Sequence, residues 1–198
     1  YLMPEDRDAF SDFVRALKAQ LASEKLVLLL ALPPKTCRGQ TGLLCEAHDF
    51  RVLGRNADLC VLKNASVALG APSALADIGR MNEAVRYAVS EIPAKKLLCS
   101  LPAGGLQWAL PWHQGQRARP LAGAQAAEQA VQVGAPVRYD DAAQAPHYNF
   151  WRGGTEQEVW FEDARSYRAK CALAAEYRLG GVAVPEAAQW YSQLWGIL

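Results

Sequence analysis

Aromatic rings are concentrated in the second half of the chain, and all 6 tryptophans lie there. The candidates for ligand contact are Trp108, Asp140, Tyr148, Trp160 and Glu162. An aromatic ring can cover the apolar face of a sugar, and a carboxylate can accept hydrogen bonds from sugar hydroxyl groups. These side chains therefore predict a surface that binds a carbohydrate.

Each candidate except Tyr148 also suits a purely structural role. Trp108 and Trp160 would equally suit the packing of one segment of the protein on another. Asp140 would suit a turn, because aspartate readily accepts hydrogen bonds from the backbone that follows it. Glu162 and its neighbour Asp163 both suit the first turn of a helix, where backbone N–H groups attract carboxylates. At the level of sequence, both interpretations stay open.

Metal and cofactor chemistry is not indicated. His48, His113 and His147 are far apart, and no pair of them has the spacing of a zinc motif. The chain has neither a CxxC pair nor a glycine-rich phosphate-binding motif, so we expect no metal and no cofactor. Cys37 and Cys45 flank a loop and would suit a disulfide if the protein is exported, and free thiols are the alternative.

The composition is that of an ordinary folded domain. The chain has 198 residues, of which 51% are hydrophobic and 21% charged, and its formal net charge is +1. Because there is no basic field, we expect no binding to nucleic acid. The longest apolar run, residues 26–32, is far shorter than the roughly 20 residues that span a membrane. We expect this run to be a buried strand and predict no membrane span.

Helices and strands alternate along most of the chain. Apolar segments predict core strands at residues 26–32, 58–62, 96–101 and 182–184. Stretches with apolar residues at helical spacing separate these segments. Before the last of them, residues 107–158 contain short strand-like pieces and an alanine-rich helix, which is the pattern of an α+β insertion.

The stretch from residue 158 to residue 184 has the pattern of one repeating unit. Val159 and Phe161 are two positions apart and predict a short strand, which an acidic turn and a helix follow. Gly180 and Gly181 would end that helix, and another apolar strand begins after them. This strand-turn-helix-strand order indicates a parallel α/β fold.

The number of strands indicates half of a (β/α)8 TIM barrel. Such a barrel closes with eight parallel strands in about 250 residues, and this chain offers four core strands. We expect residues 1–106 to form the first barrel units, 107–158 the α+β insertion, and 159–198 the last barrel strand and closing helices. Half a barrel has two open edges, so we expect an N-terminal barrel half or a second copy to cover them.

Four segments resemble glycoside hydrolase family 18, in its chitinase-like branch of bacterial spore-germination and cell-wall N-acetylglucosaminidases. They are GLLCEAHDFRVLGRNADLCVL, AVRYAVSEIPAKKLLCSLPAGGLQW, VRYDDAAQAPHY and WFEDARS, in this order. The resemblance implies the C-terminal half of the family barrel, from its fifth to its eighth strand. It also implies cleavage of β-1,4 links in glycans that contain N-acetylglucosamine, such as chitin or peptidoglycan, at the cell envelope or outside the cell.

The catalytic acid that the resemblance implies has no counterpart in this sequence. Family 18 enzymes carry it as the glutamate of a DxxDxDxE motif on the fourth strand, and the substrate's own N-acetyl group is the nucleophile. The motif is absent and would end immediately before Tyr1. We therefore assign no catalytic residue to this chain.

Four supporting positions of the family also differ. By the resemblance, Ala65 and Ser66 replace a tyrosine and an acidic residue that hold the N-acetyl group. Gly104 replaces a second tyrosine, and Pro185 replaces the tryptophan that lies under the sugar. Loss of one well-placed transition-state donor typically costs about 10²–10³ in rate. We expect a catalytically degenerate copy, and the alternative is a non-catalytic glycan-binding or scaffold module.

Overall fold

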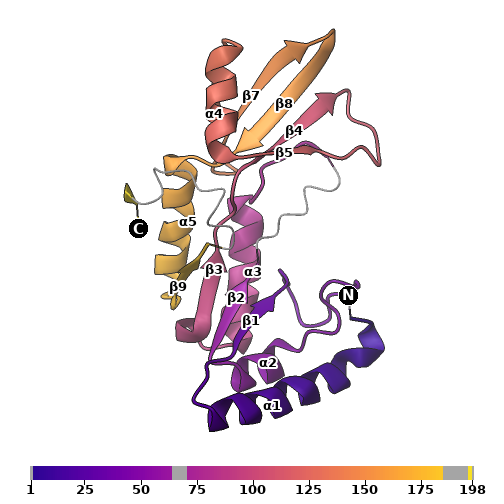
Figure 1. The fold of residues 1–198 in the computed structure, drawn as a ribbon, viewed down its shortest axis with the longest axis vertical. Coiled ribbons are helices and arrows are strands. Elements are labelled where there is room, and N and C mark those ends of the chain that lie inside the picture. The colour runs from indigo at the N-terminus through magenta and orange to yellow at the C-terminus, as the bar shows by residue number, and fades with distance from the viewer. Residues whose placement is uncertain (1, 64–70, 185–195, 198) are drawn as a thin grey trace. The chain divides into compact units, whose positions relative to one another are not determined.

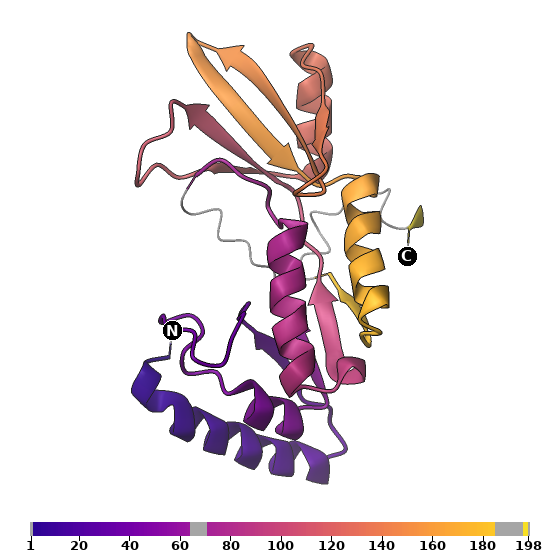
Figure 2. The same ribbon diagram turned by 180° about the vertical axis from the view of Figure 1, so that it is seen from behind.

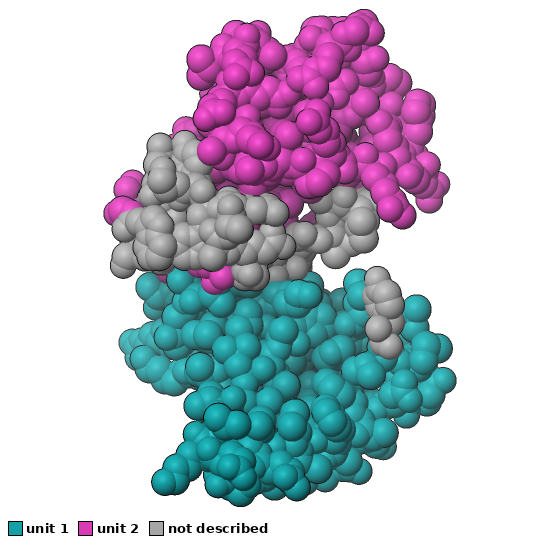
Figure 3. All heavy atoms as spheres, in the orientation of Figure 1, with its two compact units in different colours: residues 1–65, 81–100, 173–183 teal, residues 66–80, 101–172, 184–198 magenta. Residues whose placement is uncertain are grey.

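The computed structural model describes residues 2–63, 71–184 and 196–197. The chain forms two compact units, each assembled from segments that are separate in the sequence (Figure 3). Unit 1 contains residues 1–65, 81–100 and 173–183, and unit 2 contains residues 66–80, 101–172 and 184–198. Each unit has its own sheet.

Unit 1 is built on a parallel sheet of four strands in the order β1-β2-β3-β9 (Figure 1). The strands are β1 (Leu29–Leu32), β2 (Leu59–Leu62), β3 (Leu97–Ser100) and β9 (Gly181–Ala183). The helices are α1 (Arg7–Ser23), α2 (Phe50–Asn56) and most of α3 (Ile78–Glu91), with 3-10 turns at Pro4–Asp6 and Ala94–Lys96. The four apolar segments predicted as strands are therefore confirmed as strands, and their parallel pairing is confirmed.

The spacing of apolar residues accounts for these elements. Helix α3 buries Met81, Val85 and Ala88, which recur at helical intervals. Strand β2 buries Cys60 and Leu62, which are two positions apart and so point to the same face. Parallel pairing places the carboxyl ends of the four strands at one edge of the sheet, where the side chains of α/β enzymes usually act. No helix in the described part of the chain is long and apolar enough to cross a membrane.

The prediction that residues 26–32 form a fully buried strand is wrong. Only Leu28 and Leu32 are buried, whereas Leu26, Val27 and Leu29 are 55%, 67% and 50% exposed. The strand begins at Leu29 and lies at one end of the four-stranded sheet, so among the described residues it has a neighbouring strand on one side only. An apolar run predicts burial but does not show whether the covering layer is present.

Unit 2 is built on an antiparallel sheet of five strands in the order β5-β4-β8-β7-β6. They are β4 (Gly105–Leu110), β5 (Arg119–Leu121), β6 (Arg138–Asp140), β7 (Ala145–Arg152) and β8 (Thr155–Phe161). Helix α4 (Gly123–Gln132) lies along one face of this sheet (Figure 1, Figure 2). The core on that face consists of Leu121, Ala126, Ala130, Tyr148, Phe150, Val159 and Phe161. Helix α5 (Ala164–Glu176) follows β8.

One predicted strand has different partners from those expected. The sequence predicts that Val159 and Phe161 open a parallel unit, but they end β8, which pairs antiparallel with β4 and β7. Alternation of apolar residues shows that one face of a strand is buried and does not show which strands lie beside it. The strand after α5 is β9, which does pair with β3 in parallel. Most of the segment after β9, where a closing helix is predicted, lies outside the described residues.

Candidate functional site

The face of the antiparallel sheet opposite α4 carries both predicted contact tryptophans. Residues that pair directly across an antiparallel sheet share a face. Glu158 pairs with Trp108 on one side and with Asn149 on the other, and Trp160 pairs with His147. We call the surface formed by Trp108, His147, Asn149, Glu158 and Trp160 the indole face.

The two tryptophans of the indole face lie in a hydrophobic cluster. Trp108 is 1% exposed and Trp160 is 9% exposed, and the cluster also contains Ala74, Ala143 and Ala145. Neither ring therefore has an open face onto which a sugar could stack. Packing accounts for both side chains, and their contact with a sugar stays a prediction.

The polar atoms of these rings are only partly paired. The Trp160 ring stacks on His147 at 4.5 Å between centroids, and its Nε1 donates a hydrogen bond of 2.6 Å to Oε1 of Glu158. Trp108 Nε1 and His147 Nδ1 are buried and have no hydrogen-bond partner among the described residues. The indole face thus combines buried rings with donor and acceptor groups.

Tyr148 lies on the opposite face, beneath α4. Its side chain is 1% exposed, and its hydroxyl donates to the carbonyl oxygen of Ala126 at 2.8 Å. Burial raises the pKa of Tyr148 to about 12. These contacts join α4 to the sheet, and they leave the predicted contact of Tyr148 with a sugar without support in this structure.

Asp140 has the contacts of a turn cap. Its Oδ1 accepts hydrogen bonds from the backbone N–H groups of Ala142 and Ala143, at 2.9 and 2.8 Å. The alternative that the sequence left open for this residue is therefore confirmed. The side chain is half-buried at the end of β6, so its second oxygen Oδ2 would be the atom that meets a ligand.

Glu162 and Asp163 have different roles although they are adjacent. Asp163 caps α5, because its Oδ1 accepts from the backbone N–H groups of Arg165 and Ser166 at 2.9 and 3.0 Å. Glu162 is fully buried and forms an ion pair with the equally buried Lys170, at 2.8 Å. Burial raises the pKa of Glu162, and the ammonium group of Lys170 opposes that rise.

The segment after β3 is held from the side of α5. The backbone N–H of Glu162 donates to the carbonyl oxygen of Gly104 at 3.2 Å, and the Tyr167 hydroxyl donates to that of Pro102 at 3.0 Å. Gly104 has φ +84°, and a Cβ atom there would overlap the carbonyl oxygen of Leu121. The turn therefore requires glycine at this position.

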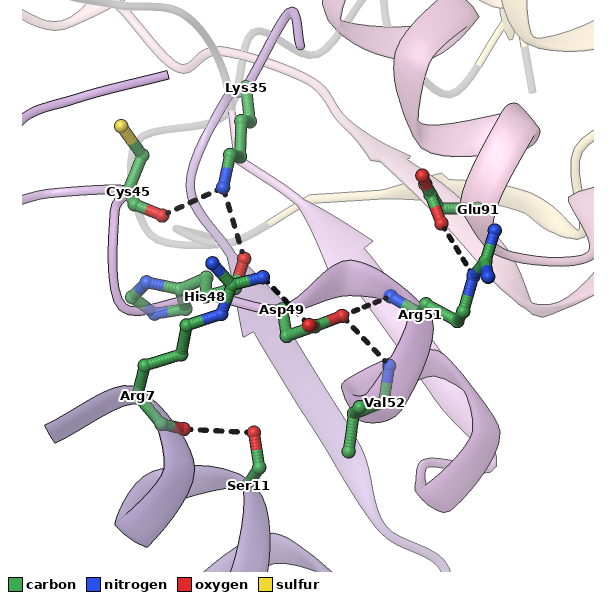
Figure 4. A network of polar contacts seen from close by, with 9 residues as sticks. All are labelled: Arg7, Ser11, Lys35, Cys45, His48, Asp49, Arg51, Val52 and Glu91. Atoms are coloured by element: carbon green, nitrogen blue, oxygen red, sulfur yellow. Dashed lines mark hydrogen bonds and ion pairs between the residues drawn. The ribbon is translucent and has the colours of Figure 1, made fainter. Parts of the chain in front are cut away.

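A second polar cluster lies in unit 1, and the sequence patterns do not single it out (Figure 4). Arg7 donates to Oδ2 of Asp49 at 2.7 Å. Lys35, just after β1, is 1% exposed, and its Nζ donates to the carbonyl oxygens of Cys45 and His48 at 3.4 and 3.3 Å. These bonds tie the segment before α2 to the carboxyl end of β1.

Electrostatics in this cluster follow from burial and from the two cations. Burial lowers the pKa of Lys35, and the charge of Arg7 lowers it further. Burial would raise the pKa of Asp49, but hydrogen bonds from Arg7 and from the backbone of Val52 lower it below its ordinary value. Asp49 also caps α2. An aspartate at the start of a helix is therefore the sequence signal that could have pointed to this cluster.

The thiols near this cluster are free. Cys37 is exposed and Cys45 is buried, and the two form no disulfide in this structure. Burial raises the pKa of the Cys45 thiol, which makes it a weaker nucleophile at neutral pH. The disulfide alternative is therefore not supported, and no chemistry is assigned to these sulfur atoms.

Comparison with known proteins identifies the family. The model of the glycosyl hydrolases family 18 matches residues 2–189. The chain belongs to this family. It is 36% identical over 199 residues to the cortical fragment-lytic enzyme of Bacillus cereus, covering 98% of this chain and 46% of that protein. Family 18 is thus shown by the family model, which matches nearly the whole chain.

Solved structures of other proteins are also similar to this chain. The spore cortex-lytic enzyme SleL of Bacillus megaterium QM B1551 has a TM-score of 0.93 at 36% identity, over 98% of this chain and 45% of that one. A chitinase from Chromobacterium violaceum has a TM-score of 0.89 at 26% identity, over 98% of this chain and 61% of that one. The chain spans about half the length of the curated relatives it matches.

Of the four family 18 positions at which the sequence differs from expectation, only Gly104 is described. Ala65, Ser66 and Pro185 lie outside the described residues. At Gly104 the backbone leaves no space for a side chain. A tyrosine at that position would require a different course of the segment that follows β3.

Proposed function

We propose that this chain is part of a family 18 domain that binds β-1,4-linked glycans containing N-acetylglucosamine, and that this copy hydrolyses them poorly or not at all. The names of its relatives support the substrate class, since they include a cortical fragment-lytic enzyme and a chitinase. Peptidoglycan is the favoured glycan, because relatives at 36% identity include a cortical fragment-lytic enzyme and a spore cortex-lytic enzyme.

The geometry at Gly104 is the observation that carries the proposed loss of hydrolysis. The resemblance to family 18 implies a tyrosine at position 104, and the backbone around Gly104 leaves no space for a side chain. With Ala65, Ser66 and Pro185, four groups that would hold or stack the sugar are replaced. Because single transition-state contacts are worth about 10²–10³ in rate, the combined loss would leave little activity.

A non-catalytic glycan-binding or scaffold module is the second candidate. Under this candidate, the full-length protein does not cleave the glycan at all. The indole face favours a binding role over a purely structural one, because it carries carboxylate and amide groups beside an exposed indole ring, that of Trp151. Cleavage of chitooligosaccharide by the full-length protein tests both candidates, and we expect none above background.

We also propose that the parallel sheet is the C-terminal half of the family barrel, with β1, β2, β3 and β9 as its fifth to eighth strands. The exposed apolar residues Leu26, Val27 and Leu29 support this proposal, because a completed barrel would cover such a surface. A further part of the protein or a second copy would provide the cover.

The association state of the isolated chain tests this part of the proposal. We expect sedimentation velocity to show self-association that increases with concentration, since β1 and β9 are the outermost strands among the described residues and would offer unpaired backbone groups. A soluble monomer over the whole concentration range would contradict it. A Leu29→Glu/Val27→Glu variant is the matched control and should sediment as a smaller species.

A further inference from the structure

The indole face continues toward the turn between β7 and β8 and becomes exposed there. Trp151 pairs with Glu156, and Glu156 pairs with Leu110 on its other side, so the three share this face. Trp151 is 69% exposed, in contrast to the buried Trp108 and Trp160. The exposed ring therefore lies next to the sheet positions that carry the polar groups of this face.

Acceptor atoms lie on the same face of the sheet as that ring. Asn149 is exposed, and its Nδ2 donates to Oε1 of Glu156 at 3.1 Å. Oε1 of Glu158 accepts from Trp160. Within the part of the chain that the structure describes, the Oε2 atoms of Glu156 and Glu158 accept no hydrogen bond from another residue. Two carboxylates on one face thus retain acceptor capacity beside an indole ring.

The backbone that carries the ring belongs to a regular, paired strand. Asn149, Trp151 and Arg152 all pair with β8 up to the turn, so Trp151 stands on a regular strand. The Arg152 guanidinium lies over the Phe150 ring at 5.1 Å, on the face beneath α4, and does not cover Trp151. A tryptophan side chain has only two side-chain torsions, so it loses little conformational entropy when a ligand stacks on it.

We infer that Trp151, Asn149, Glu156 and Glu158 form a glycan-binding platform, with Trp151 stacking on a pyranose and the carboxylates accepting hydrogen bonds from hydroxyl and amide N–H groups. The inference rests on the proposed function and adds the surface that would hold the glycan chain. Two carboxylates argue against a protein partner, because charged residues are depleted at the centre of protein interfaces. They also argue against nucleic acid or an anionic membrane, whose phosphates they would repel.

The experiment measures binding of the full-length protein to an N-acetylglucosamine hexamer by isothermal titration calorimetry, with insoluble peptidoglycan in a pull-down as second probe. The Trp151→Ala variant is expected to bind both about ten-fold or more weakly. Trp151→Phe should retain part of the affinity, because a smaller ring can still stack. The matched control is Val131→Ala on α4, an apolar side chain that is 82% exposed on the other side of the sheet, and it should bind like the unchanged protein.

The outcomes separate this inference from the proposed function. If the unchanged protein binds the hexamer and Trp151→Ala binds equally well, the platform is wrong and the proposed function stands. If the unchanged protein binds neither probe, the proposed function fails and the platform fails with it. Equal weakening of binding by Val131→Ala would also overturn the platform, because Val131 lies on α4, on the other side of the sheet from Trp151.

Discussion

Replacing Lys170 with methionine is expected to lower the free energy of unfolding by about 3–5 kcal/mol at neutral pH. Lys170 and Glu162 are both fully buried, and their ion pair of 2.8 Å is the contact that compensates the carboxylate for leaving water. Without the ammonium group, the carboxylate would be buried and unpaired. Among the ion pairs of the described residues, this is the pair whose two side chains are both 0% exposed.

The loss should depend on pH with a defined sign. Burial already holds the pKa of Glu162 above its ordinary value of 4.5, and removal of Lys170 raises it further. Between the ordinary value and the folded value, the unfolded chain is ionised while the folded chain must bind a proton, which destabilises the fold as pH rises. The deficit of Lys170→Met should therefore be largest at neutral pH and should shrink as pH falls toward 4.5.

Urea unfolding followed by circular dichroism measures both effects. Glu162→Met/Lys170→Met is the informative control, because replacing a buried pair by apolar side chains of similar size is often neutral. Arg15→Met removes one partner of the exposed pair with Asp12 and should cost at most about 1 kcal/mol. A Lys170→Met loss that equals the loss in the double variant and does not vary with pH would show that packing, not charge, is responsible.

Gly104→Ala is expected to cost about 2–5 kcal/mol of unfolding free energy. A positive φ costs a side-chain-bearing residue roughly 1–2 kcal/mol, and forcing an extra atom into a packed site costs about 1–3 kcal/mol more. The obstacle at Gly104 is the backbone carbonyl of Leu121, which cannot rotate away as a flexible side chain would. Gly104→Tyr, which restores the residue expected from the family, should be at least as unstable and should not gain activity.

Gly115→Ala is the matched control for this prediction. Gly115 has φ +90°, close to the +84° of Gly104, but no atom lies within 4 Å of a Cβ placed there. Its substitution should therefore cost only the backbone term of about 1–2 kcal/mol. Thermal unfolding of the two alanine variants compares them directly. If Gly115→Ala and Gly104→Ala lose equal stability, the close approach to Leu121 is not a constraint.

Sequence patterns predicted the core elements better than their surroundings. The strands β2 and β3 were predicted correctly because short apolar runs bounded by turn residues are typical of buried strands. The burial of Leu29 was predicted wrongly, because an apolar run does not reveal that its strand lies at the end of a sheet. The pairing of Val159 with β4 and β7 was missed for the same reason: partners are set by contacts distant in sequence.

The candidate site shows the same division. Residue types drew attention to the sheet of unit 2, where contact with a sugar stays a prediction. Burial separates Trp108 from Trp151, and no local pattern distinguishes the two. Glu162 and Asp163 are adjacent acidic residues, and only the structure shows that Asp163 caps α5 whereas Glu162 pairs with Lys170. Lys35 bonds to carbonyl oxygens 10 and 13 residues away, which no motif marks.

The most direct test of the account is a cleavage assay on the full-length protein with chromogenic N-acetylglucosamine oligomers and with peptidoglycan fragments. We predict that glycan binds and that chromophore and new reducing ends do not rise above the blank, because the positions meant to hold the acetamido sugar cannot do so. Steady release that is abolished by substituting the glutamate of a DxxDxDxE motif in the full-length protein would contradict the account.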